Sequence, residues 1–589
     1  MNPRITLVMI VRNEAAVLER CLESVKNAVD EMVIVDTGST DRTVEIARRY
    51  TARVYHRPWD DDFAAARNFA LERAGGHWIL SLDADETLEP DGADLRALAA
   101  DRDGREAFLL PLYNEGYGFP GHYHYVLRFF RNNGRYRFSG RIHEQVTVAD
   151  PEKVGTAAGP LIRHHADSER ERRRKRGRNL KLLRRAGPEL PAPFQNYYLG
   201  VEWLALNRPE RALPCFARAR EMLTDAHLQF RLPALLHLLT CLVRLNRLDE
   251  AICLCLEESR RYPFYSDIFF FGGQLFEAGG EFAVAAKWFQ EALRCGRPPI
   301  PCYHQEGTES FLSYYHLGYC LEQTGEYRQA TEYYRRALEH NPDYIYPLYN
   351  LFLLVLAEKG AGEAFRYFQA AGCFSRPGQA SLLADLFFTA GYPDLAGACL
   401  QTPGDNPPGA LTRRLIRCHL YAGRPEQALV LIERLRAKAP DLPVTADEIT
   451  ALLVCGEYVS ARTRALSLWR RPAGRNEALA FLVLTALMEK GFSRLRPEKH
   501  RRAEVIQTLL AAVKPCLCAP PPEGKKADRY RLLAERTLRW LTDLSPAGCA
   551  AVCGCLKEQA ASMGKLAALK FGPAGGLWPC PTDRPSAYA

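Results

Sequence analysis

The chain has 589 residues, 47% of them hydrophobic, which is enough to bury more than one core. Its formal net charge of +9 is mild for this length and does not by itself demand a polyanionic partner such as a nucleic acid. The sequence starts with a strand-like segment rather than a signal sequence, and no apolar run reaches membrane-spanning length, so we expect a cytoplasmic protein without a membrane span.

Strand-like and helix-like segments alternate through the first hundred residues. Apolar runs at 5–11 and 32–35 are each followed by an amphipathic segment, at 15–25 and 43–50. This alternation predicts an α/β domain with a mainly parallel sheet, whose ligands bind outside the carboxyl ends of the strands. The turn after the first strand lacks G-x-G-x-x-G, so a dinucleotide fold is excluded.

A third apolar run, 79–82, ends abruptly in the carboxylates of Asp83, Asp85 and Glu86. Two nearby carboxylates repel each other unless a positive charge lies between them. Mg²⁺ or Mn²⁺ held in this way keeps open positions for the oxygens of a diphosphate. The alternative is that these residues cap the next helix.

Four ordered segments carry a family resemblance. The chain resembles family 2 of the inverting GT-A glycosyltransferases over about residues 5–183, in the segments IVRNEAAVLERCLESV, VIVDTGSTDRT, WDDDFAAARNFAL and LSLDADE. The later segments LRFFR, FSGRIHEQV and LIRHHAD resemble a bacterial subgroup whose catalytic domain is joined to tetratricopeptide-like repeats. The resemblance implies an α/β domain that binds a nucleotide-diphosphate sugar and displaces the nucleotide directly at the anomeric carbon.

The resemblance also assigns donor-binding and metal-binding residues. Asp36 resembles the acid that reads the uracil ring, and Arg67 resembles the basic residue near ribose and phosphate. Asp83 and Asp85 resemble the metal motif, with Asp83 close to the donor as well. The alternative for Arg67 is an ordinary arginine on a helix surface.

The acceptor nucleophile must lose a proton during the attack, so a basic side chain has to stand near it. Segment 140–146 offers Glu144 as this base and His143 as a metal-shell or orienting residue, where many family members carry a Glu-Asp pair. His164, after a strand-like segment at 159–163, resembles a late histidine that completes the metal shell. The alternatives are a hydrogen-bonded core histidine for His143 and a packing or loop role for His164.

Two segments allow opposing interpretations. Segment 113–125 is rich in glycine and aromatic residues, which suits either a wall or lid of an acceptor site or an ordinary irregular loop. The basic run 170–178 could contact phosphates, but it lacks interleaved aromatic residues, so we expect a solvated helix and no nucleic-acid partner.

From residue 196 onward the pattern becomes a repeated helical hairpin. Alanines that mark the second helix of each hairpin recur at intervals of 32 to 45 residues, at positions 212, 251, 285, 330, 364, 396, 428 and 461. These intervals lie close to the tetratricopeptide period of about 34 residues and predict an all-α solenoid. The longest interval contains 296–301, a proline-rich stretch that predicts an inserted loop.

The carboxyl-terminal part predicts helices at 501–513 and 528–544, and its cysteines lack the paired spacing of common zinc sites. We therefore expect a GT-A domain over 1–183, helical repeats over 184–475, a helical cap over 476–571 and a flexible tail over 572–589.

These patterns lead to two functional hypotheses. The first is a metal-dependent inverting enzyme, using Mn²⁺ or Mg²⁺, that moves a sugar from a UDP-sugar to a peptide, protein or glycan acceptor selected by the repeats. The repeats could also mediate self-association. The second hypothesis is a repeat scaffold or assembly protein with a vestigial glycosyltransferase domain.

Overall fold

The computed structural model describes most of the chain in eleven ranges: residues 3–89, 94–100, 103–116, 120–165, 169–186, 191–400, 409–438, 445–470, 474–497, 502–518 and 525–544. The described residues form two compact units. The first extends from Met1 to Gly325, and the second begins at Glu326.

The described residues of the first unit contain a mixed ten-stranded sheet and a two-stranded ribbon. The strands are β1 Ile5–Val11, β2 Glu31–Asp36, β3 Val54–His56, β4 Trp78–Ser81, β5 Glu86–Glu89, β6 Ala107–Asn114, β7 His122–Arg131, β8 Phe138–Ser139, β9 Gln145–Val146, β10 Val154–Thr156, β11 Leu161–His164 and β12 His304–Gln305. The main sheet runs β3-β2-β1-β4-β7-β6-β11-β5, with β10 paired to β6 and β12 paired to β7, and the ribbon is β8-β9.

The first four strands of this order are parallel, and β7 runs antiparallel to both β4 and β6. Four helices follow the early strands: α1 Leu18–Val25, α2 Thr43–Tyr50, α3 Phe63–Leu71 and α4 Leu95–Ala99. The predicted α/β domain is confirmed.

The apolar strands are buried because helices or loops cover both faces of the sheet. Alternate residues of a strand point to opposite faces, so Leu7 and Met9 of β1 enter one core while Val8 enters the other. This arrangement leaves the carboxyl ends of β1, β2 and β4 at one edge, which is where the polar residues of the candidate site begin.

The two ends of the glycine-rich and aromatic segment 113–125 are strands, so the segment is not an irregular loop throughout. Tyr113 lies near the end of β6 and Tyr125 lies in β7, and the two strands form a long antiparallel hairpin. Residues 117–119 at its tip lie outside the described residues.

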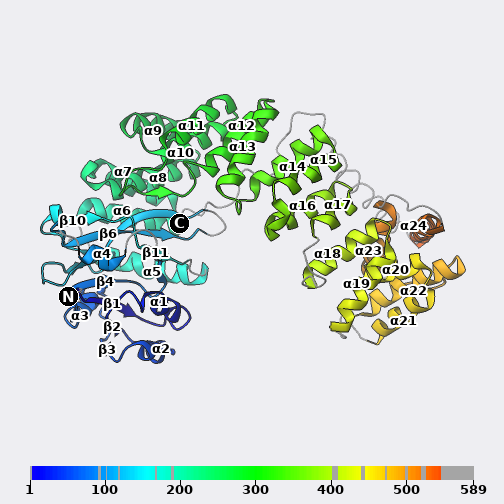
Figure 1. The fold of residues 1–589 in the computed structure, drawn as a ribbon, viewed down its shortest axis with the longest axis horizontal. Coiled ribbons are helices and arrows are strands. Elements are labelled where there is room, and N and C mark those ends of the chain that lie inside the picture. The colour runs from blue at the N-terminus through cyan, green and yellow to red at the C-terminus, as the bar shows by residue number, and fades with distance from the viewer. Residues whose placement is uncertain are drawn as a thin grey trace. The chain divides into compact units, whose positions relative to one another are not determined.

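The rest of the described chain is helical, as predicted. Its helices are α5 Glu169–Ala186, α6 Ala192–Ala205, α7 Pro209–Met222, α8 Leu228–Arg244, α9 Leu248–Arg261, α10 Ser266–Ala278, α11 Phe282–Cys295, α12 Phe311–Gln323, α13 Tyr327–His340, α14 Tyr346–Lys359, α15 Ala361–Ala370, α16 Pro377–Thr389, α17 Pro393–Cys399, α18 Gly409–Tyr421, α19 Pro425–Lys438, α20 Ala446–Cys455, α21 Tyr458–Trp469, α22 Arg475–Lys490, α23 Arg502–Cys518 and α24 Lys525–Leu544. Single 3₁₀ turns occur at Pro151–Lys153, Asp225–His227 and Cys373–Ser375. Figure 1 shows α6 between strand β6 and helices α7 and α8.

The marker alanines have the burial that a helical hairpin repeat requires. All eight, from Ala212 to Ala461, are fully buried, and each lies in the second helix of a consecutive pair. The short connection within each pair contains one residue with positive φ, which is Asn207 or Asn246 in the first two pairs and a glycine in the later ones. Such a residue ends the first helix and lets the chain turn back within a few residues.

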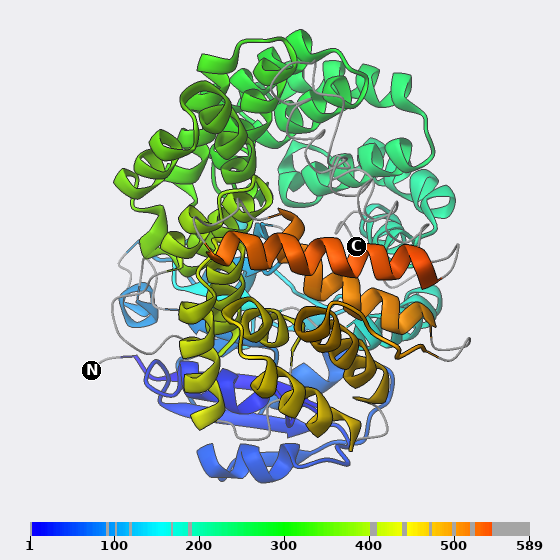
Figure 2. The ribbon, with the colours of Figure 1, turned by 90° about the vertical axis from the view of Figure 1, so that its right-hand side faces the viewer.

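The second unit has its own core. Apolar residues of α18 to α24 form one cluster, which includes Leu453, Phe481 and Leu541. Figure 2 shows the last helices of this unit in yellow to orange. In the described part of the chain, one helical segment, Asp225–Arg244, is long and apolar enough to cross a membrane, and 61% of its apolar window is buried inside the protein.

The observed division differs from the boundary expected near residue 183. Helices α5 to α12 belong to the same compact unit as the sheet. The end of the predicted cap and the whole predicted tail, beyond residue 544, lie outside the described residues.

Candidate functional site

The site begins at the end of β4, where the chain leaves the sheet as Asp83-Ala84-Asp85-Glu86. The carboxylate of Glu86 turns back and accepts a hydrogen bond from the backbone N–H of Asp83 at 2.8 Å. Arg67 donates from Nη2 to Oδ1 of Asp83 at 2.5 Å, and Arg128 donates from Nη2 to Oδ2 at 2.9 Å. Both oxygens of Asp83 therefore face guanidinium groups.

Arg67 connects three parts of the site. Besides Asp83, it donates from Nε to Oε1 of Glu144 at 2.5 Å and from Nη1 to the hydroxyl of Ser81 at 3.2 Å. Only 5% of Arg67 is exposed, because α3, which begins at the N-cap Asp62, packs this face against the sheet. The alternative of a helix-surface arginine is therefore wrong.

The electrostatics of this network follow from burial and pairing. Burial alone raises the pKa of Asp83, but the charges of Arg67 and Arg128 outweigh burial and hold that pKa well below its usual range. The pKa of Glu86 is raised, mainly by burial, and the charge of Asp83 adds to the effect. Arg128 also pairs with Glu86, at 3.0 Å.

Asp85 meets His164 at the end of β11. Oδ2 of Asp85 lies 3.5 Å from Nε2 of His164. Burial lowers the pKa of His164, but the hydrogen bond and charge of Asp85 outweigh it, so that pKa lies above its ordinary value. β11 pairs with β5, which follows Asp85, so the sheet register brings the two side chains together.

A second polar layer fixes the ring of His164. Nδ1 of His164 lies 2.9 Å from Oδ1 of Asn114, and the amide nitrogen of Asn114 lies 3.1 Å from ring nitrogens of both His122 and His124. Burial lowers the pKa of His122 to about 4 and that of His124 to about 3, so both are neutral at pH 7. With Nδ1 engaged by the amide oxygen, Nε2 of His164 is the nitrogen that faces Asp85.

These donors fit a divalent cation in part. Asp85 and His164 present one oxygen and one nitrogen toward each other, with an amide behind the imidazole, which is the usual second layer of a histidine metal ligand. Asp83 is instead bound by two arginines. Among the described residues, no group of three or more His, Cys, Asp or Glu side chains has the arrangement of a metal site.

Asp36 lies at the end of β2 and is 4% exposed. Its carboxylate accepts hydrogen bonds from the backbone N–H groups of Gly38 and Ser39, at 3.2 and 3.0 Å, and lies 3.1 Å from Nδ1 of His56. Asp36 therefore shapes the loop after β2 in this structure, and its role in reading a uracil ring stays a prediction.

The two predicted catalytic residues point in different directions. Glu144 faces Arg67, whereas the ring of His143 stacks on Tyr198 of α6 with centroids 3.9 Å apart. The structure thus joins Arg67, Asp83 and Glu144 in one network and pairs Asp85 with His164. Asp36, at the end of β2, bonds to the loop that follows it.

Sequence reasoning missed several members of the site. Arg128 lies in the LRFFR segment, where a charged residue inside a strand-like run was a usable signal. Asn114 and Tyr198 carried no such signal, because their roles depend on contacts between segments far apart in the chain.

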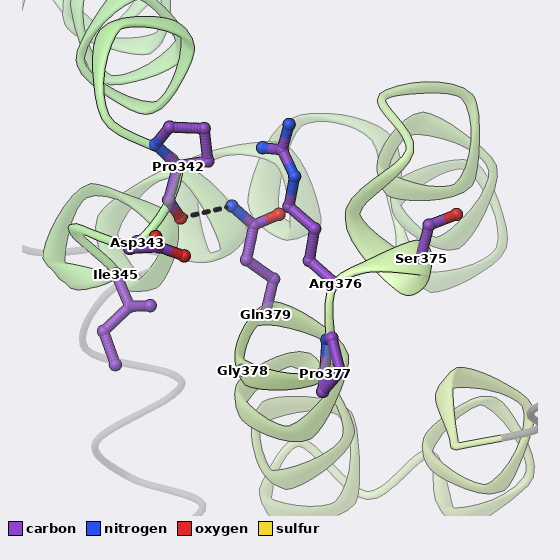
Figure 3. A pocket seen from close by; sticks show the side chains of 8 residues that line it. All are labelled: Pro342, Asp343, Ile345, Ser375, Arg376, Pro377, Gly378 and Gln379. Atoms are coloured by element: carbon purple, nitrogen blue, oxygen red, sulfur yellow. Dashed lines mark hydrogen bonds between the residues drawn. The ribbon is translucent and has the colours of Figure 1, made fainter. Parts of the chain in front are cut away.

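A pocket of about 360 Å³ lies in the second unit between α13 and α16 (Figure 3). Gln379 lies at its wall and donates to the carbonyl of Pro342 at 2.7 Å. Its ionisable lining residues, Asp343 and Arg376, are both exposed. The pocket thus has no buried ionisable group of the kind found at the mouth of β4.

The fold and the site define an α/β domain with a carboxylate-rich strand end, continued by helical hairpins. Residues 6–169 match the family model described as Glycosyl transferase family 2, and residues 311–344 match the one described as Tetratricopeptide repeat. The amino-terminal domain is therefore a family 2 glycosyltransferase domain, and the helical region contains a tetratricopeptide repeat.

Two curated relatives are similar to parts of the chain. A TPR repeat-containing protein of Synechococcus elongatus is 38% identical over 192 residues, which are 30% of this chain and 45% of that protein. The prophage-derived glycosyltransferase SunS of Bacillus subtilis is 33% identical over 150 residues, 24% of this chain and 35% of that protein. The chain thus matches less than half the length of either relative.

Among solved structures, MamA is similar to part of the helical fold, with 18% identity, coverage of 29% of this chain and 91% of that chain, and a TM-score of 0.24. A likeness at this score carries no argument about function.

Proposed function

We propose that this protein is an inverting glycosyltransferase that moves a sugar from a UDP-sugar to a peptide, protein or glycan acceptor, with Mn²⁺ or Mg²⁺ as the cofactor. The observation that carries the proposal is the presence of two pairs of interacting side chains near the carboxyl end of β4. The Asp85–His164 pair offers cation ligands, and the Arg67–Glu144 pair holds a buried carboxylate beside them. A scaffold with a vestigial domain has no need of either pair.

In this proposal Asp85 and His164 bind the divalent cation, and Asp83 holds Arg67 and Arg128 in place. When bound, the cation supplies stabilisation of the negative charge that develops on the leaving diphosphate. Manganese suits a mixed carboxylate and imidazole donor set better than magnesium does.

Glu144 is the proposed base. Its Oε1 accepts the hydrogen bond from Arg67, so we assign Oε2 to the proton that the acceptor nucleophile loses. The side chain of Glu144 is 10% exposed, so it is sheltered from bulk water yet within reach of a group that enters the site.

The helical region supports a macromolecular acceptor. Stacked helical hairpins form extended surfaces that suit a peptide or protein chain. A cytoplasmic location is part of the same proposal, because nucleotide sugars of this class serve as donors there, and self-association through the repeats is compatible with it.

The test measures UDP binding to the full-length protein by calorimetry, with Mn²⁺ and with EDTA, and UDP release from a panel of UDP-sugars. We expect binding that depends on Mn²⁺ and is lost in Asp85→Asn, because that carboxylate would hold the cation whose charge stabilises the diphosphate. Asp249→Asn, an exposed acid of α9, is the matched control. UDP affinity that is equal with and without metal, and equal in both variants, contradicts the metal assignment. No UDP release above background from any UDP-sugar supports the scaffold hypothesis.

A further inference from the structure

The loop that carries the proposed base is held by a helix of the repeat region. Residues 140–144 connect the ribbon strands β8 and β9, and α6 lies against this loop. The imidazole of His143 is parallel to the ring of Tyr198, with 2° between the planes and 3.9 Å between the centroids. The hydroxyl of Tyr198 also accepts a hydrogen bond from the amide of Gln145, at 3.0 Å.

One turn further along α6, Glu202 faces the same imidazole. Its Oε1 lies 3.5 Å from Nε2 of His143, and no part of its side chain is exposed. Arg176 and Asn179 of α5 donate to this oxygen at 3.3 and 3.1 Å. Burial raises the pKa of Glu202, but the adjacent imidazole of His143 and the charge of Arg176 outweigh burial, so that pKa is lowered and Glu202 remains a carboxylate.

The backbone of the loop has an unfavourable conformation that the contacts of Tyr198 and Glu202 with His143 can stabilise. His143 has φ 51°, a left-handed conformation that a non-glycine residue adopts only at a cost in free energy. This conformation directs three consecutive side chains to three different partners. Ile142 is buried with Leu182 and Leu183 of α5, His143 stacks on Tyr198, and Glu144 reaches Arg67.

We propose that Tyr198 and Glu202 are positioning residues for the base Glu144. They hold His143 in its left-handed conformation, and this conformation places the next residue against Arg67. The repeat region thus has a role in the reaction itself, in addition to any role in acceptor selection. This inference rests on the proposed function.

The test uses variants of the full-length protein, each first shown to melt cooperatively. Glu202→Gln keeps the shape of the side chain and removes its charge, Tyr198→Leu removes the stacked ring, and Tyr198→Phe keeps the ring but loses the hydroxyl. Glu210→Gln, an exposed acid of α7, is the matched control.

We expect Tyr198→Leu and Glu202→Gln to lower kcat for UDP-sugar turnover by roughly tenfold to a hundredfold, while KM for the donor and UDP affinity stay within twofold of wild type. Tyr198→Phe should recover most of the activity that Tyr198→Leu loses. Hydrogen exchange should become faster in the peptide that contains residues 140–146 and stay unchanged in the peptide that contains β1.

A kcat within twofold of wild type in Tyr198→Leu, or an equal loss of UDP affinity and kcat, overturns the positioning role. If wild type neither binds UDP nor turns over any UDP-sugar, the proposed function fails and the hydrogen-exchange measurement alone decides whether α6 holds the loop. Unchanged exchange over residues 140–146 in both variants then overturns the inference.

Discussion

At the scale of residues, carboxylates outnumber guanidinium groups at the mouth of β4. The carboxylates are Asp83, Asp85, Glu86 and Glu144, and the guanidinium groups are those of Arg67 and Arg128. Burial makes this excess of negative charge costly, which the raised pKa of Glu86 reflects. A bound divalent cation would reduce the cost, so the charge balance agrees with the proposed cofactor.

The carboxylate of Glu144 can be removed with little change of shape. Glu144→Gln keeps an oxygen that can accept from Arg67 but cannot take a proton. We expect UDP affinity to survive while turnover with a hydroxyl acceptor falls by roughly a hundredfold or more. A cysteine acceptor should suffer less, because its thiol is already partly ionised near neutral pH. Turnover within twofold of wild type on a hydroxyl acceptor would move the role of the base to another residue.

His304 makes the stability of the first unit depend on pH. Its imidazole lies between Asp267, 2.8 Å from Nδ1, and Glu309, 3.0 Å from Nε2. Burial lowers the pKa of His304, but the two carboxylates outweigh burial and raise it to about 9. The folded pKa therefore lies above the ordinary value, so the stabilisation is complete below about pH 6.5 and is lost as pH rises through about 9.

We expect His304→Gln to lower the free energy of unfolding by about 2 to 4 kcal/mol at pH 6, because it leaves two carboxylates without their buried cation. The difference from wild type should shrink as pH rises to about 9.5. Thermal melts across this range measure it, and His340→Gln, at an exposed histidine of α13, is the control. A difference that stays constant from pH 6 to 9.5 would contradict the protonated state of His304.

At the scale of elements, the helical hairpins were predictable because their signal is local and periodic. The marker alanines are buried where the spacing placed them, and the predicted loop at 296–301 separates α11 from α12. The hairpin of β6 and β7 was not predictable, because its Tyr, His and Gly residues do not alternate in hydrophobicity. It forms through pairing with β4, β11 and β12 rather than through its own propensity.

Close contact between α10 and α11 depends on Gly273. A Cβ atom on Gly273 would lie 2.6 Å from the ring of Phe289, which is fully buried. We expect Gly273→Ala to lower the free energy of unfolding by about 1 to 3 kcal/mol, because a packed ring has to move. Gly362→Ala in α15, where no atom lies within 4 Å, should be neutral or stabilising. Denaturant unfolding of both variants compares them, and equal stability would show that the helices separate without cost.

At the scale of the molecule, the compact units do not follow the change in sequence pattern. The pattern changes from strands to repeats near residue 183, but α5 to α12 belong with the sheet. The sequence shows where the hydrophobic periodicity changes, but it does not show which helices pack against the sheet. The contacts that cross this change of pattern include the stack of His143 on Tyr198, the hydrogen bond from Tyr113 to Glu306, and the pairing of β12 with β7.

Truncation distinguishes the two boundaries. We expect a fragment ending at Gly325 to melt cooperatively and to keep the UDP affinity of the full chain. A fragment ending at Leu183 should melt at least ~5 °C lower or not cooperatively, because it lacks β12 and the side chain of Tyr198 that covers Ile142. Calorimetry measures the UDP affinity of each fragment, and circular dichroism measures its melting temperature. Equal melting temperatures of the two fragments would place the boundary near residue 183 after all.

The pairing of β12 with β7 has a consequence for synthesis on the ribosome. β6 pairs with one edge of β7. On the other edge, β4 pairs with Phe129 to Arg131 and β12 pairs with His122 to Tyr123. About 180 residues separate β7 from β12, so at ordinary translation rates this part of the edge waits roughly 10 to 40 s for its partner. During that interval the nascent chain exposes backbone donors and acceptors that another chain could pair with. Yield of native protein should therefore depend on translation speed and chaperone supply between these two points of the message.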